Sequence, residues 1–120
     1  MNELKLGSVE GRFAEIIWQR EPISSGELVR ICEKELEWKK STTYTVLKKL
    51  CEKGMFKNER GTVSSLISKE EYCSIKSQKF VEDTFEGSLP AFIAAFAKRQ
   101  ELTRKDIEDI KAMIDAMGEC

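Results

Sequence analysis

Residues 41–54, S-T-T-Y-T-V-L-K-K-L-C-E-K-G, constrain the fold of this chain more than any other segment. Their apolar and small side chains recur at helical spacing. These inward candidates are Thr43, Val46, Leu47 and Leu50. The opposite face carries hydroxyls followed by cations: Ser41, Thr42, Tyr44, Thr45, Lys48 and Lys49. Gly54 supplies the usual left-handed stop. The segment therefore predicts an amphipathic helix with a polar, partly cationic exposed face.

That exposed face suits double-stranded nucleic acid. Short polar groups reach base edges, and lysines neutralise phosphates. The alternative is a solvated surface helix, which is what most charged helical faces are. The helix alone leaves both interpretations open.

The next segment favours the first interpretation. Two short segments, residues 55–59 and 62–67, contain apolar and β-branched side chains. They flank Arg60-Gly61. Glycine permits the positive φ of a tight hairpin, and Lys57 and Arg60 make the tip basic. A helix-turn-helix followed by a hairpin is the order of a winged helix, whose reading helix enters the major groove while the hairpin approaches the backbone. The hairpin could instead be a sheet edge that only covers the core.

Capping boxes mark three helix starts. A hydroxyl followed three residues later by an acid can satisfy free backbone N–H groups at a helix N-terminus. The pairs are Ser24 with Glu27, Ser68 with Glu71, and Thr103 with Asp106. With the apolar periodicity, they predict helices over residues 9–20, 25–35, 40–53, 69–86, 89–99 and 104–117. Trp18 is expected in the core. Trp38 could fill the corner between the second and third helices, which we favour, or lie near the sugar-phosphate backbone.

These elements give a mainly α fold with a small β wing. At 120 residues, the length suits one small domain with an appendage. We expect a winged helix-turn-helix DNA-binding domain over residues 1–68 and a helical dimerisation segment over residues 69–120.

The charge distribution supports a partner of opposite charge near the third helix. Residues 1–80 hold fifteen Lys/Arg and twelve Asp/Glu, a net of +3, whereas residues 81–120 hold five and nine, a net of −4. Residues 39–57 contain six lysines and a single acid, Glu52. The chain's pI of about 5.7 therefore does not argue against nucleic acid, because the local field matters.

Composition also argues against other classes. The chain has no histidine, and its four cysteines form no CxC or CxxC pair, so neither a metal site nor a cofactor is expected. Its acid pairs lack a surrounding nucleophile or base, so we expect no enzyme. No secretory signal or membrane-spanning run is visible. We expect a cytoplasmic protein without membrane insertion, with reduced and mostly buried thiols.

The last three predicted helices carry more apolar surface than one small winged helix can cover. Their apolar side chains are Ile75, Phe80 and Phe85 on the first, Leu89, Phe92, Ile93, Phe96 and Ala97 on the second, and Ile107, Ile110, Ile114 and Met117 on the third. Large exposed apolar patches mark interfaces. A homodimer would bury the same patch twice and present two reading helices. The alternative is a tail that folds back on its own domain.

Three segments resemble a known family. The run T-T-Y-T-V-L-K-K-L-C-E-K-G resembles the family pattern T-V-x-T-L-L-x-R-L-x-x-K-G, and A-E-I-I-W followed by P-I-S-S-G-E-L resembles its first two helices. Residues 88–114 resemble its dimerisation segment. The family is the penicillinase-repressor group, the BlaI/MecI/CopY winged-helix repressors of bacteria. The resemblance implies a homodimeric repressor on a palindromic operator with TACA/TGTA-type half-sites, upstream of β-lactamase or related resistance genes.

The resemblance assigns roles to individual residues. Expected DNA contacts are Ser41, Thr42, Tyr44, Thr45, Lys48 and Lys49, joined by Arg60 on the hairpin. The apolar stripes, and not the resemblance, give the expected dimer contacts: Phe92, Ile93, Phe96, Ile107, Ile110 and Ile114. Two positions depart from the family: Thr43 stands where Val or Ile is usual, and Lys39 where Ser is frequent.

The family's branches differ in how they release DNA. The copper-responsive branch ends in paired CxC motifs, whereas this chain has a single Cys120, which argues against copper sensing. The β-lactam branch responds to a membrane sensor-protease pathway and is cut between Asn and Phe, which correspond here to Ala95 and Phe96. The alternative function is a winged-helix protein-interaction module without sequence-specific DNA binding.

Overall fold

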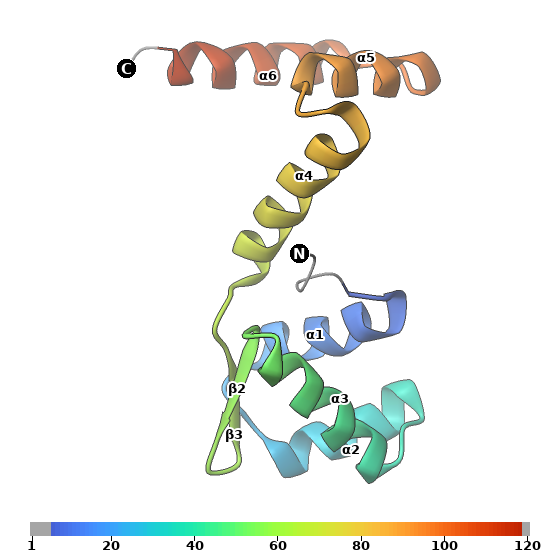
Figure 1. Ribbon diagram of the computed structural model, residues 1–120, viewed down its shortest axis with the longest axis vertical. Coiled ribbons are helices and arrows are strands. Elements are labelled where there is room, and N and C mark those ends of the chain that lie inside the picture. Colours follow the sequence, from blue (N-terminus) through green and yellow to red (C-terminus); the bar gives the residue numbers. More distant parts are fainter. Residues whose placement is uncertain (1–5, 119–120) are drawn as a thin grey trace. The chain divides into compact units, whose positions relative to one another are not determined.

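The computed structural model describes residues 6–118, which form six helices and a three-stranded sheet (Figure 1). The elements are α1 (Ser8–Arg20), β1 (Ile23–Ser24), α2 (Ser25–Leu36), α3 (Lys40–Glu52), β2 (Phe56–Glu59), β3 (Thr62–Ser65), α4 (Lys69–Phe85), α5 (Leu89–Arg99) and α6 (Arg104–Met117). The predicted mainly α winged-helix fold is confirmed. Cys120 lies outside the described residues.

The chain packs as two compact units, one up to Ser77 and one from Gln78 onward. The core of the first unit joins α1, α2, α3 and the sheet. Its fully buried side chains include Phe13, Ile17, Leu28, Leu50, Met55, Phe56 and Val63. Thr43 and Leu47 are buried as the helical spacing predicts, so the face of α3 that points inward is the expected one.

The sheet has the strand order β1-β3-β2, and all pairs are antiparallel. The hairpin of β2 and β3 turns at Arg60 and Gly61, whose φ values of 54° and 85° are both positive, as the sequence predicts for a tight turn. β1 was not predicted. It is only two residues long, and Ile23 pairs with the distant Val63.

In every predicted capping box, the Ser or Thr hydroxyl accepts the expected hydrogen bond from the backbone. Ser24 Oγ, Ser68 Oγ and Thr103 Oγ1 each accept a hydrogen bond from the backbone N–H three residues later, at 3.0–3.1 Å. Ser88 caps α5 in the same way, at 3.1 Å from the N–H of Ala91. Sequence reasoning missed this cap because no acid stands at the third helical position.

The two tryptophans help to set the edges of the first unit. The ring of Trp38 lies 5.4 Å from that of Phe13, so it fills the corner between α2 and α3 as predicted. Trp18 packs 5.6 Å from Tyr72 of α4, and its indole N–H donates to the Ile67 carbonyl at 3.0 Å. These contacts anchor the beginning of α4 on the first unit.

The unit from Gln78 onward leaves much of its apolar surface in water. The rings of Phe80, Phe85 and Phe92 form a cluster with all three centroid distances at 5.6–6.0 Å, and the ring of Phe96 lies 6.3 Å from that of Phe92. No side chain of α5 or α6 is buried. A groove of about 290 Å³ lies between these helices, with Phe92, Ile93, Phe96, Leu102 and Ile110 among its lining residues.

The cysteines differ in environment more than expected. Cys32 is buried, and burial raises the pKa of its thiol to about 11. Cys51 is half-buried, with its pKa raised by the same cause. Cys73 is exposed, so the expectation of mostly buried thiols is wrong there. Within residues 6–118, no acidic, cysteine or histidine cluster could hold a metal ion, and no helix is long and apolar enough to cross a membrane.

Candidate nucleic-acid interface

α3 rests on the core by one face and presents the other to solvent. The six side chains predicted to face outward are all exposed: Ser41, Thr42, Tyr44, Thr45, Lys48 and Lys49. The helix runs from Lys40 to Glu52, and Gly54 follows with a φ of 82°. Helical spacing and the glycine stop thus place a row of hydroxyls ahead of two lysines on one surface.

The beginning of α3 lacks the hydroxyl cap that α2, α4, α5 and α6 have. Lys39 occupies the N-cap position with an extended backbone and provides no side-chain hydrogen bond. The Thr43 hydroxyl donates to the Lys39 carbonyl at 3.4 Å. A lysine has no acceptor for the N–H groups of the first turn, so these groups remain available to solvent or to an anion.

The two lysines of α3 have unlike surroundings. Lys49 Nζ lies 2.9 Å from a Glu10 carboxylate oxygen on α1, and this hydrogen bond holds the pKa of Glu10 below its ordinary value. Glu10 also accepts from the Gly7 N–H at 3.1 Å. Lys48 makes no ion pair within the described part of the chain. The lysine with its charge fully available for a phosphate is therefore Lys48.

The hairpin presents its own cations beside this surface. Arg60 is exposed at the turn, whereas Lys57 pairs with Glu59 at 3.2 Å. The turn is stabilised by the Asn58 side-chain oxygen, which accepts from the Gly61 N–H at 3.1 Å. Of the two basic residues predicted at the tip, Arg60 is the better placed for an anionic partner.

One contact on this surface was not predicted. The Tyr44 hydroxyl donates to Ser25 Oγ at 3.1 Å, and the Ser25 N–H donates to the Gly61 carbonyl at 2.8 Å. Ser25 is the first residue of α2. The expected DNA contact Tyr44 thus already has a partner inside the protein. No local sequence signal could have revealed it, because the two residues are nineteen positions apart.

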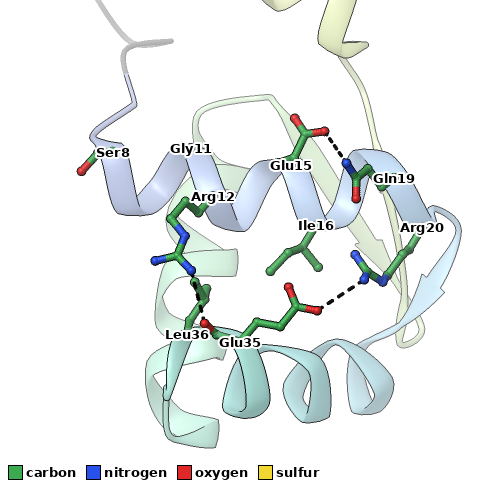
Figure 2. A pocket seen from close by; sticks show the side chains of 9 residues that line it. All are labelled: Ser8, Gly11, Arg12, Glu15, Ile16, Gln19, Arg20, Glu35 and Leu36. Carbon is green, nitrogen blue, oxygen red and sulfur yellow. Dashed lines mark hydrogen bonds and ion pairs between the residues drawn. The ribbon is translucent and has the colours of Figure 1, made fainter.

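A second groove, of about 390 Å³, lies between α1 and α2 (Figure 2). Figure 2 shows Arg12 and Arg20 both reaching Glu35 of α2, at 3.3 Å to its carbonyl and 3.4 Å to its carboxylate. Glu15 accepts from Gln19 at 2.9 Å on the same wall. Two arginines and two glutamates balance, so this groove offers no net positive charge to a nucleic acid.

The sequence as a whole matches known proteins. Residues 6–116 match the family described as penicillinase repressor. The chain belongs to the penicillinase repressor family. It is 26% identical to the penicillinase repressor of Staphylococcus aureus over 117 residues, covering 94% of this chain and 93% of that protein. It is 22% identical to the penicillinase repressor of Bacillus licheniformis, covering 92% and 90%. It is 19% identical to the methicillin resistance regulatory protein MecI of Staphylococcus aureus strain Mu50, covering 92% and 94%.

Family membership settles the class of this protein. Members of the penicillinase repressor family are DNA-binding regulators of transcription rather than enzymes. The matched region begins before α1 and ends within α6, so it covers most of both compact units. A regulator of this kind needs an element that meets DNA, and α3 is the exposed cationic helix of its winged-helix unit.

Proposed function

We propose that this penicillinase repressor family member is a homodimeric repressor that binds a palindromic operator. Its targets would be β-lactamase or related resistance genes in the bacterial cytoplasm. The observation that carries the proposal is the exposed face of α3, where hydroxyls precede Lys48 above a buried apolar face. Residues 1–68 would bind DNA, and residues 69–120 would dimerise.

The exposed side chains other than Tyr44, whose hydroxyl already donates to Ser25, have direct roles in the proposal. Ser41, Thr42 and Thr45 would meet base edges in the major groove, where hydroxyls bond to bases and a threonine methyl packs on thymine. Lys48 and Arg60 would contact phosphates, which position the protein without reading sequence. Lys49 would have to leave Glu10 first, so its net contribution should be smaller than that of Lys48.

Dimerisation is supported by the apolar surface of α5 and α6. Phe96 is 43% exposed, and Ile107, Met113, Ile114 and Met117 are 40–67% exposed. The groove lined by Phe92, Ile93 and Ile110 adjoins this surface. A second copy related by a two-fold axis would cover both patches at once and would match the symmetry of a palindrome.

Release from DNA would follow cleavage of the dimerisation segment through a membrane sensor-protease pathway. The candidate bond, Ala95–Phe96, lies inside α5, and both side chains are exposed in the single chain. Cleavage there would separate α6 from the rest of the protein and leave the first unit whole. The reading surface would then persist on monomers that bind operator weakly.

The proposal is tested with the full chain and two duplexes of equal length. One carries a palindrome with TACA/TGTA half-sites, and the other carries the same bases scrambled. We expect a preference of at least about 10³ for the palindrome and a log affinity that falls linearly with log salt. Sedimentation should show two chains per palindrome. Equal affinity for both duplexes, or no binding to either, would favour a protein-interaction module instead.

A further inference from the structure

Ser25 is the residue at which three elements of the first unit meet. Its Oγ accepts a hydrogen bond from the Tyr44 hydroxyl of α3 at 3.1 Å. Its backbone N–H donates to the Gly61 carbonyl in the hairpin turn at 2.8 Å. Ser25 itself is the first residue of α2 and follows the N-cap Ser24. A single residue therefore connects the start of α2 to the face of α3 and to the turn.

The surrounding contacts fix the turn against this residue. Ser24 pairs with Thr62 across β1 and β3, so the backbone register continues directly into the bond from Ser25 to Gly61. A Cβ added at Gly61 would lie 3.8 Å from Ser25 Oγ, which places the turn in van der Waals range of the hydroxyl. The turn cannot shift along β1 without breaking these bonds.

We propose that Ser25 is a positioning residue for operator recognition, which holds the hairpin turn and the reading face of α3 at a fixed separation. This inference rests on the proposed function. Arg60 on the turn and Thr45 on α3 would contact the same duplex, and both can do so only when their separation matches the groove. The Tyr44 hydroxyl then acts inside the protein, through Ser25, rather than on a base or a phosphate.

A double-mutant cycle on palindrome affinity at fixed salt separates these two roles for Tyr44. Tyr44→Phe and Ser25→Ala each remove one partner of the same bond, so each should weaken binding by about two- to tenfold. The double variant should be no weaker than the weaker single variant. If Tyr44→Phe costs the same factor again in the Ser25→Ala background, the hydroxyl contacts DNA and the inference is wrong. Ser41→Ala is the matched control, because its loss should multiply with that of Ser25→Ala.

A second cycle tests the turn. Ser25→Pro removes the N–H donor, and proline is tolerated at the first helical position. Ser24 already has the extended backbone that a residue before proline requires, with φ −71° and ψ 148°. Arg60→Ala should cost severalfold less affinity in this background than in the wild type, because the turn is no longer held. An unchanged cost of Arg60→Ala would overturn the proposal.

Two measurements keep the test decisive. If Ser25→Pro fails to fold, as judged by circular dichroism, the Arg60→Ala cycle is repeated in the Tyr44→Phe background, where the Ser25 N–H still holds the turn and only the bond to α3 is lost. The cost of Arg60→Ala should then fall by a smaller factor, and an unchanged cost would again overturn the proposal. Hydrogen exchange of the Ser25 amide needs no DNA, and it should accelerate severalfold in Tyr44→Phe if the three elements are coupled. Unchanged exchange contradicts the link itself, whereas a wild type without palindrome preference contradicts only the proposed function.

Discussion

Removal of α6 should convert the protein into a monomer that keeps its reading surface. A chain ending at Arg99 loses Ile107, Met113, Ile114 and Met117, which are 40–67% exposed in the single chain. Full burial of such a side chain is worth about 1.5–3 kcal/mol, so covering the exposed half of each contributes about 1 kcal/mol. A two-fold interface counts every side chain twice, so α6 contributes about 8 kcal/mol before association costs.

A loss of this size is comparable to the whole binding free energy of a dimer of micromolar affinity. A dissociation constant of about 1 µM corresponds to about 8 kcal/mol in total. The shortened chain should therefore sediment as a monomer at micromolar concentration. Its palindrome affinity should fall by about 10²–10⁴, because the tethered second half-site is gone. Its affinity for an isolated half-site should stay unchanged, since the first unit ends before the truncation.

Sedimentation velocity and gel shift at one salt concentration measure both effects. Phe96→Asp provides a full-length comparison, because it places a charge in the same proposed interface. Ala91→Asp is its matched control, since Ala91 lies on α5 outside the apolar stripe. The reasoning is refuted if the shortened chain still dimerises and binds the full palindrome with native affinity.

Three smaller changes test separate parts of the structure. Lys39→Ser gives α3 an N-cap acceptor and should raise the free energy of unfolding by about 0.5–2 kcal/mol in urea titrations; a lower value would mean that the first turn is stabilised in another way. The pKa of Glu10 is lowered by its hydrogen bond from Lys49. The contribution of this carboxylate to the free energy of unfolding is therefore present above pH 4.5 and is lost as pH falls through the lower folded pKa. Glu10→Gln should therefore lower the free energy of unfolding at pH 7 and reduce its further decrease below pH 4.5. An unchanged decrease below pH 4.5 would contradict this. In a Cys120→Ser background, an alkylating reagent at pH 7.5 should modify Cys73 rapidly and Cys32 only after unfolding, because Cys32 is buried with a pKa of about 11; rapid modification of Cys32 in the folded protein would count against the described core.

The helices were predictable because their signals are local. The spacing of Leu47 and Leu50 gives the buried face of α3, and Gly54 gives its end within a few residues. The caps at Ser24, Ser68 and Thr103 similarly depend on groups three positions apart. Periodicity and capping chemistry therefore recover most of the secondary structure.

The features that the sequence did not predict are contacts between segments that lie far apart in the chain. β1 has two residues, too few to show alternation, and its partner Val63 lies forty positions away from Ile23. The ion pair of Lys49 with Glu10 also joins segments far apart in sequence. Sequence reasoning could identify an exposed cationic face on α3, but not which of its side chains already have partners in the folded protein.

The most direct test of the central claim compares the salt dependence and sequence preference of two α3 variants on the palindromic duplex. Lys48→Ala should weaken binding to all sequences alike and make the log–log salt slope shallower by about two per dimer, one for each lost phosphate contact. Thr45→Ala should leave the slope unchanged and reduce discrimination against the scrambled duplex by about 1–3 kcal/mol per contact. If both variants keep wild-type palindrome affinity at the same salt concentration, α3 is not the element that reads DNA.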